Sequence, residues 1–266
     1  MSLKKPLFVV VAGDGINCER ETATALQIAG AAASIVHVND LLAAPEMLRS
    51  ADGFAIPGGF SFGDELGSGQ IMALKMKYRL GEAFYSMVRA QKPIIGICNG
   101  FQVLVKLGLL PFPDVDQRVT ALAANRQGAF IDQWVRLKVE DSVCLWTSGL
   151  DRREIELPIR HGEGRIVFAA GQEEDVYRRL QRQRQIPLTY SEDVNGSFGR
   201  IAALTDPSGC VLGLMPHPEA FVSADTYRHP AKMRREGEQK HPVSGDGLSI
   251  FRQIVSVMAD KPRMTG

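Results

Sequence analysis

Short apolar runs alternate with segments of helical periodicity in the first part of the chain. Runs such as LFVVVA at residues 7–12 and IIGI at residues 94–97 are typical of strands buried on both faces of a parallel sheet. Such β-α alternation favours parallel strands joined by right-handed crossovers. The pattern predicts strands at residues 7–12, 34–38, 53–56 and 94–97, and helical segments at residues 19–29 and 44–49, within 67–90, and after residue 98.

The pattern changes after Leu110, where Pro111-Phe112-Pro113 ends the last of these helices. Apolar segments then follow one another with shorter connections, which is typical of antiparallel strands. The sequence therefore predicts a single three-layer α/β domain over residues 1–266, with a mostly parallel central sheet plus added antiparallel strands. The added strands are expected at residues 119–122, 130–139, 143–146, 154–158, 199–205 and 211–215.

Two helices and one loop complete the predicted organisation. Residues 173–185 form a highly charged helix, interpreted as a solvated surface helix rather than an anion-binding patch because acidic residues precede its arginines. Residues 225–244 have little apolar content and are broken by Pro and Gly, which indicates an exposed loop. Apolar positions at helical spacing over residues 246–259 predict an amphipathic C-terminal helix.

The charge balance and the cysteines exclude several classes of protein. With 31 basic and 30 acidic residues, the chain has no global attraction to nucleic acid or to an anionic membrane. No apolar run approaches the roughly 20 residues of a membrane span, and the first residues do not form a signal peptide, so we expect a cytoplasmic protein. The four cysteines (18, 98, 144 and 210) form no C-x-x-C pair, which favours free thiols over disulfides or zinc ligands.

Cys98 is the candidate nucleophile, because it stands where a buried strand turns into a helix. Gly96 and Gly100 flank it at equal distance, as in the G-x-nucleophile-x-G pattern of a nucleophile elbow. Glycine is needed there because a β-carbon would collide with neighbouring backbone in so tight a turn. The unpaired N–H groups at the start of the helix favour a negatively charged sulfur. The alternative is a cysteine buried in the core.

Two glycine-rich segments are candidate binding loops. Residues 57–64, PGGFSFGD, follow a predicted parallel strand and should lie near Cys98 at the carboxyl edge of the sheet. The adjacent glycines Gly58 and Gly59 allow backbone N–H groups to face a ligand, as in an oxyanion hole. Residues 160–165, RHGEGR, are polar between two apolar strands. Taken alone, the first segment could be an ordinary turn and the second a hairpin turn.

His217 and Glu219 are a candidate base and its orienting carboxylate. His217 stands between two prolines in Met215-Pro216-His217-Pro218-Glu219, and a residue before proline is pushed toward extended backbone. Residues two apart in an extended chain project to the same side, so the two side chains should meet. A structural His–Glu pair is the alternative. Together with Cys98 they have the composition of an acyl-transfer triad.

These motifs together resemble the class I glutamine amidotransferases, and within them the glutaminase subunits of phosphoribosylformylglycinamidine synthase. The resemblance covers nearly the whole chain and is carried by DGINCE, IPGGFSFGD, GICNGFQVLVKLGLLP, HGEGR, NGS, MPHPE and DGLSIFRQIV. The chain departs from small bacterial relatives at Ala220, where they usually have Arg, and in its longer loop at residues 225–244.

The resemblance implies a glutaminase that acts in purine biosynthesis through a Cys98–His217–Glu219 triad. It implies an oxyanion held by the N–H groups of Gly59 and Asn99, and substrate contacts from Gln102 and the loop formed by His161, Gly162 and Glu163. L-Glutamine would be hydrolysed through a cysteinyl thioester. The ammonia would pass to a large ATP-dependent synthetase that makes formylglycinamidine ribonucleotide, with a small third subunit in the complex.

The resemblance implies no metal or nucleotide cofactor in this chain and assigns ATP and Mg²⁺ to the synthetase. The absence of a G-x-x-x-x-G-K-[ST] motif agrees with that expectation. Three alternatives remain open at this point: a glutaminase that serves another synthetase, a stand-alone cysteine hydrolase, and a catalytically silent scaffold subunit.

Overall fold

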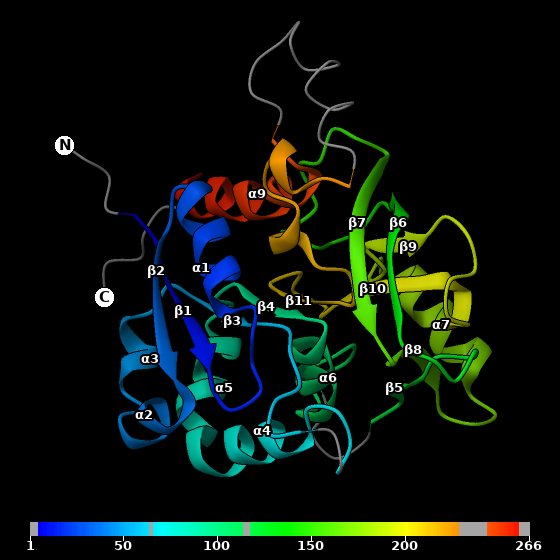
Figure 1. The fold of residues 1–266 in the computed structure, drawn as a ribbon. Coiled ribbons are helices and arrows are strands. Elements are labelled where there is room, and N and C mark those ends of the chain that lie inside the picture. Colours follow the sequence, from blue (N-terminus) through cyan, green and yellow to red (C-terminus); the bar gives the residue numbers. More distant parts are fainter. Residues whose placement is uncertain (1–4, 64–65, 114–117, 229–243, 261–266) are drawn as a thin grey trace, which may run out of the picture.

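The computed structural model describes residues 5–63, 66–113, 118–228 and 244–260. Within these residues nine strands form one mixed sheet in the order β2-β1-β3-β4-β11-β10-β9-β6-β7, and two more form a small antiparallel sheet (Figure 1). No helix in this described part of the chain is long and apolar enough to cross a membrane. Most of the predicted loop at residues 225–244, and Asp64 of the first glycine-rich loop, lie outside the described residues.

Five parallel strands form one half of the large sheet. Four of them are those that the β-α alternation predicts, whereas β11 was predicted among the added antiparallel strands but pairs parallel to β4. β4 lies between β3 and β11, and all three strands are fully buried. Because the three strands run in the same direction, the segments that follow them emerge at one edge of the sheet. The parallel strands are β1 (Leu7–Ala12), β2 (Ala32–His37), β3 (Gly53–Ile56), β4 (Ile94–Ile97) and β11 (Val211–Leu214).

Helices cover both faces of the parallel strands (Figure 1). α1 and α9 lie together on one face, and α3, α5 and α6 lie on the other. Between residues 67 and 90 the expected long helix is divided into α4, a π-helical turn at Met76–Leu80 and α5. The helices are α1 (Glu19–Ile28), α2 (Val38–Ala43), α3 (Met47–Ser50), α4 (Gln70–Lys75), α5 (Gly81–Arg89), α6 (Asn99–Lys106), α7 (Glu173–Arg182) and α9 (Asp246–Asp260).

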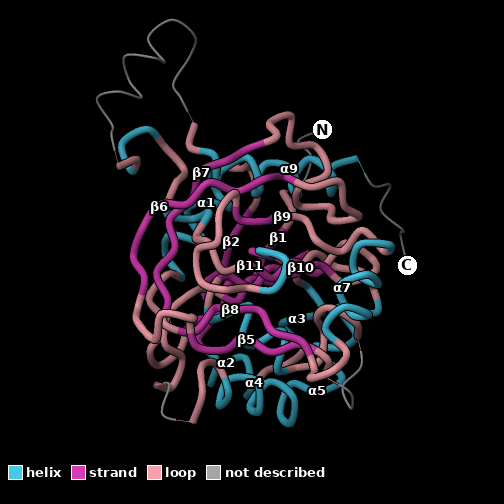
Figure 2. The backbone as a smooth tube through the Cα atoms, turned by 90° about the vertical axis from the view of Figure 1, so that its right-hand side faces the viewer, coloured by secondary structure: helices cyan, strands magenta, loops and turns pink. Residues whose placement is uncertain are grey.

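Antiparallel strands extend the sheet beyond β11, which confirms the predicted change of architecture after Leu110. β10 (Ile201–Thr205), β9 (Leu188–Tyr190), β6 (Ile131–Val139) and β7 (Glu154–His161) follow in that order. β5 (Thr120–Ala124) and β8 (Glu163–Phe168) pair only with each other and form a separate ribbon (Figure 2). The short strand β9 is absent from the pattern-based prediction.

The strand predicted at residues 143–146 is wrong. Its backbone bonds to two loops instead of a strand, since Val143 N–H donates to Arg184 O at 2.9 Å and Leu145 N–H to Gly209 O at 2.9 Å. The apolar character of the segment comes from burial: Trp146 is completely buried, and its indole N–H donates to Cys210 O at 3.0 Å. The apolar residues of this segment thus indicate that it is buried, but they do not indicate a strand.

Candidate active site

Cys98 occupies a strained turn between β4 and α6. Its backbone has φ 51° and ψ −104°, which L-residues rarely adopt and which costs on the order of 1–3 kcal/mol. The Cys98 N–H donates to Leu214 O of β11 at 2.8 Å and so fixes the turn to the sheet. A β-carbon on Gly96 would lie 2.5 Å from Gly100 O, and one on Gly100 would lie 1.9 Å from Ile56 O. The two glycines therefore have the steric purpose that the sequence predicts.

Replacing Gly100 with alanine is expected to destabilise the protein strongly. The new β-carbon would overlap the carbonyl oxygen of Ile56, which is fixed in the buried strand β3, so strand and helix must separate. We expect a loss of about 3 kcal/mol or more, measured by denaturant unfolding. Gly162→Ala is the matched control, because its β-carbon would meet nothing closer than Phe130 at 3.8 Å. Equal stability of the two variants would contradict this account of the elbow.

His217 and Glu219 meet as the sequence predicts, although the backbone between them is not extended. Residues Pro218–Ala220 form a 3₁₀ turn with proline at its start. His217 Nδ1 and Glu219 Oε1 are 2.6 Å apart, and both side chains are buried. The His217 N–H donates to Pro158 O of β7 at 2.9 Å. This bond fixes the pair to β7.

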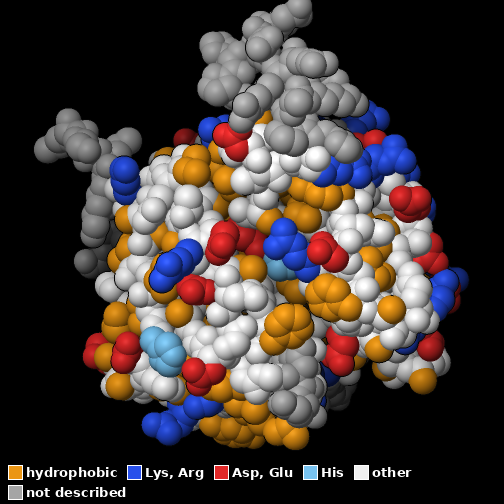
Figure 3. All heavy atoms as spheres, viewed as in Figure 1, with side chains coloured by type: hydrophobic (Ala, Val, Ile, Leu, Met, Phe, Trp, Pro, Cys, Tyr) orange, Lys and Arg blue, Asp and Glu red, His pale blue; other side chains and the backbone are white. Residues whose placement is uncertain are grey.

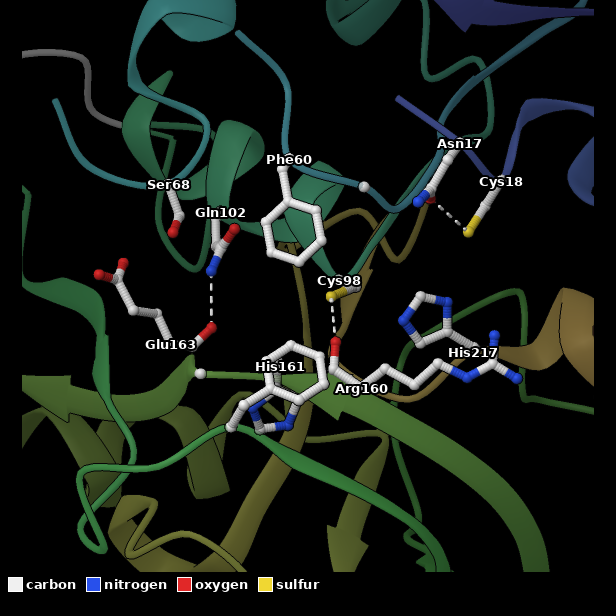
Figure 4. A pocket seen from close by; sticks show the side chains of 13 residues that line it. Asn17, Cys18, Phe60, Ser68, Cys98, Gln102, Arg160, His161, Glu163 and His217 are labelled. Carbon is white, nitrogen blue, oxygen red and sulfur yellow. Dashed lines mark hydrogen bonds between the residues drawn. The ribbon is translucent and has the colours of Figure 1, made fainter. Parts of the chain in front are cut away.

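Neighbouring charges set the protonation of His217. Burial lowers its pKa, but the carboxylate of Glu219, the negative charge of Cys98 and the nearby thiol of Cys18 outweigh burial and raise the pKa well above the ordinary 6.5. Figure 4 shows the imidazole beside the sulfur of Cys98. A histidine in this state holds a proton that it can give to a leaving group, and it stabilises a neighbouring thiolate.

The first glycine-rich loop supports the site in two ways. The backbone on either side of Gly59 is bonded to the segment that follows β1, since Phe60 N–H donates to Gly15 O at 2.7 Å and Gly58 O accepts from Asn17 N–H at 3.3 Å. Gly59, with φ 143°, lines the cavity in front of Cys98. Gly58 lies against the histidine instead, because a β-carbon there would be 2.7 Å from His217 Cε1. Gly58 thus makes room for the imidazole.

A chain of buried hydrogen bonds connects the first glycine-rich loop, α6 and the start of β8 around Cys98. Ser61 Oγ donates to Asn99 Oδ1 at 2.6 Å, and Asn99 Nδ2 donates to Gln102 Oε1 at 3.0 Å. Gln102 Nε2 then donates to Glu163 O at 2.6 Å. Asn99 is the first residue of α6, so its N–H stands at the open start of that helix. The side chain of Gln102 also lines the cavity, but both ends of its amide are engaged in this chain of bonds.

The RHGEGR segment contains a crossing point between two sheets rather than a long loop. β7 ends at His161 in the large sheet, and β8 begins at Glu163 in the small one, with Gly162 between them. His161 Nδ1 lies 3.1 Å from Asn125 Oδ1, and Asn125 Nδ2 donates to His161 O at 2.7 Å. Burial, reinforced by the charge of His217, lowers the pKa of His161 to about 4. His161 is therefore neutral at physiological pH.

The NGS motif supports this histidine indirectly. Asn195 Nδ2 donates to Asn125 Oδ1 at 3.5 Å, and Ser197 Oγ donates to Asn195 Oδ1 at 2.8 Å. All three side chains are buried. The motif thus stabilises the turn that carries His161 and does not line the cavity.

These elements enclose one small cavity of about 140 Å³ in front of Cys98. The cavity is lined by Cys98, Gly59, Gln102, His217 and the His161–Glu163 turn (Figure 4). Glu219 does not line it and contacts His217 Nδ1. On the surface, charged and hydrophobic side chains surround a small patch of histidine in the middle of this face (Figure 3). Sequence reasoning did not assign a site role to six other lining residues, namely Asn17, Cys18, Phe60, Ser68, Phe130 and Arg160.

Three of these additional residues, Asn17, Cys18 and Phe60, lie within motifs that carry the family resemblance. Asn17 and Cys18 belong to DGINCE, the stretch that follows β1 at the same sheet edge as Cys98. Arg160 begins the RHGEGR segment, and its backbone oxygen lies 3.6 Å from the Cys98 sulfur. The motifs therefore indicated that these positions belong to the site, whereas the spacing of the residues alone did not.

Comparison with known proteins agrees with the geometry. A family model for the CobB/CobQ-like glutamine amidotransferase domain matches residues 5–257. The chain belongs to this family. Among similar members, the phosphoribosylformylglycinamidine synthase subunit PurQ of Methanococcus maripaludis is 38% identical over 94% of this chain and 96% of that protein. The PurQ subunit of Dehalococcoides mccartyi is 37% identical over 95% of this chain and 98% of that protein.

A solved structure shows the same glutamine amidotransferase fold. A chain in the structure of PurLQS from Thermotoga maritima superposes with a TM-score of 0.73 at 32% identity, covering 96% of this chain and 99% of that one. A glutamine amidotransferase from the same organism, 14% identical with a TM-score of 0.55, shares the fold. The predicted family and the α/β fold with its mixed sheet are thereby confirmed.

Proposed function

We propose that this chain is the glutaminase subunit of a phosphoribosylformylglycinamidine synthase. It would hydrolyse L-glutamine to glutamate and pass the ammonia to a large ATP-dependent synthetase subunit, with a small third subunit in the complex. The observation that carries the proposal is the meeting of the Cys98 elbow and the buried His217–Glu219 pair at one cavity. The similarity to PurQ subunits, over nearly the full length of both chains, selects this synthetase among the alternatives.

The proposed reaction begins with attack of the Cys98 sulfur on the side-chain amide carbon of glutamine. The negative charge that develops on the amide oxygen would be held by the N–H groups of Gly59 and Asn99, and each such donor contributes about 3–4 kcal/mol. His217, whose pKa is raised, gives its proton to the departing nitrogen, so ammonia leaves and a γ-glutamyl thioester forms. His217 then takes a proton from water, which cleaves the thioester to glutamate and restores the thiol.

The remaining groups bind and position the substrate in this proposal. Neutral His161, Gly162 and Glu163 form one wall of the cavity, and Gln102 fixes that wall to α6 through Glu163 O. None of these steps involves a metal or nucleotide bound to this chain. The ATP and Mg²⁺ of the overall reaction are assigned to the synthetase, because the present sequence contains no phosphate-binding motif of the Walker type.

The isolated chain is expected to be a poor glutaminase. A subunit that supplies ammonia to another active site should hydrolyse glutamine rapidly only when that site is ready to receive it. Adding the synthetase, the small subunit and their ligands should raise the kcat of glutamine hydrolysis by at least about tenfold, equivalent to 1.4 kcal/mol of barrier. Glutamate release measured with and without the partners tests this coupling. Full activity in the isolated chain would contradict it.

A further inference from the structure

A second thiol lies beside the histidine of the site. Cys18 stands immediately before α1 and lines the same cavity as Cys98 and His217. Its S–H donates to Asn17 Oδ1 at 3.2 Å, and Figure 4 shows the sulfurs of Cys18 and Cys98 on different sides of the imidazole. One ligand atom from each of Cys18, His217 and Glu219 lies within 4.8 Å of the others. The proposed glutaminase cycle uses His217 and Glu219, but it does not use the three residues together as one ligand set.

Two of the three residues are buried, and one of them has a polar atom left over. His217 and Glu219 are each only 3% exposed, and Glu219 Oε2 has no hydrogen-bond partner in the described part of the chain. Buried polar atoms of this kind normally find a partner, which can be a bound ligand or ion. Cys18 is partly exposed, so a solute that enters the cavity can reach the cluster.

We propose that Cys18, His217 and Glu219 form a binding site for a thiophilic divalent cation of the zinc class. Zn²⁺ binds thiolate, imidazole and carboxylate at about 2.0–2.3 Å, and three protein ligands plus a water complete a tetrahedral site. Small side-chain rotations bring atoms that lie within 4.8 Å of one another to such a centre. Mg²⁺ does not suit the site, because it prefers oxygen ligands in octahedral geometry.

Binding redistributes the protons of the cluster. The thiol of Cys18 releases its proton to water and binds as the thiolate. An ion at Nδ1 displaces to water the proton now shared between His217 and Glu219, and the imidazole keeps its other proton on Nε2. Because Nε2 lies on the cavity side, the occupied histidine cannot accept a proton from Cys98 or water. Occupancy therefore switches the site off, a consequence that rests on the proposed function, whereas the binding itself does not.

Metal binding is tested directly on the full-length, metal-free protein. Zn²⁺ is titrated in competition with a chromophoric chelator, a measurement that needs no enzyme activity. We expect one ion per wild-type chain, and at least about 100-fold weaker binding at that site in Cys18→Ala and Glu219→Gln. Cys98→Ala and the matched control Cys210→Ala, a buried thiol outside the cavity, should bind as the wild type does. Mg²⁺ should not compete.

Three results would overturn the proposal: no Zn²⁺ binding by the wild type, unchanged binding in Cys18→Ala, or binding lost in Cys98→Ala but kept in Cys18→Ala. The last would place the ion between Cys98 and His217. If Cys18→Ala does not fold, Cys18→Ser replaces it, and Co²⁺ reports the ligand through the sulfur-to-metal absorption band that serine cannot give. Zinc should also inhibit glutaminase activity in the wild type but not in Cys18→Ala, each relative to its own zinc-free rate. An inactive protein that still binds zinc would count against the proposed function alone.

Discussion

Cys98→Ala is expected to abolish glutamine-dependent synthesis by the complete complex while sparing synthesis driven by an added ammonium salt. The sulfur forms the covalent bond to the substrate in the proposed reaction, whereas free ammonia reaches the synthetase without it. Glutamine hydrolysis should fall by about 10⁴-fold or more, the range seen when a catalytic nucleophile is removed. Both activities are measured on the same reconstituted complex, with glutamine and ammonium as alternative nitrogen donors.

Cys210→Ala is the matched control for this experiment, since it removes a buried thiol that does not line the cavity. It should retain both activities. Loss of the ammonium-driven reaction in Cys98→Ala would mean that the substitution disturbs the complex and not only the nucleophile. Glutamine consumption by Cys98→Ala at the wild-type rate would refute both the elbow assignment and the triad.

Local steric requirements made the parallel half of the molecule predictable. The strands at residues 7–12, 53–56 and 94–97 were predicted with their observed bounds, because each is a short apolar run ended by glycine, proline or a helix start. The elbow was predictable for the same reason. Only glycine fits at Gly96 and Gly100, so these two residues make the tight turn recognisable from the sequence alone.

The segments whose structure was predicted wrongly depend on contacts with residues distant in the sequence. Residues 143–146 read as a strand, but their partners are Arg184 and Gly209, which no local pattern connects to them. The RHGEGR segment read as a loop or hairpin turn, yet β7 and β8 belong to different sheets. His217 and Glu219 meet as predicted, but through a 3₁₀ turn, so the conclusion was right and the assumed backbone was not.

The residues of the site divide in the same way into those that local motifs predict and those that only the fold brings together. The residues recognised from motifs reach the cavity or support it, because parallel strands bring the segments after β3, β4 and β11 to one edge. Cys18 received no site role, and cysteine spacing argued against a metal site. Its proximity to His217 arises because α1, which begins just after Cys18, contacts the 3₁₀ turn that begins just after His217. Sequence spacing cannot show such a cluster, whereas the fold does.

Glu219→Gln is expected to reduce glutamine hydrolysis by about 10²–10⁴-fold, with a smaller loss than in Cys98→Ala. The amide cannot hold Nδ1 as the carboxylate does at 2.6 Å, so the imidazole loses its orientation and part of its basicity. Because the charge of Glu219 raises the pKa of His217, its removal lowers that pKa. If loss of the His217 proton sets the basic limb of the pH–rate profile, that limb should move to lower pH. Steady-state rates measured across pH in wild type and Glu219→Gln test both effects.

His217→Ala provides the comparison that separates orientation from proton transfer. It removes the base itself, so its loss should equal or exceed that of Glu219→Gln, and adding Glu219→Gln to it should change little, because the two residues act as one unit. Ammonium-driven synthesis should persist in all three variants. Additive losses in the double variant, or a basic limb unmoved in Glu219→Gln, would show that the 2.6 Å pair is a structural contact and that another group assists Cys98.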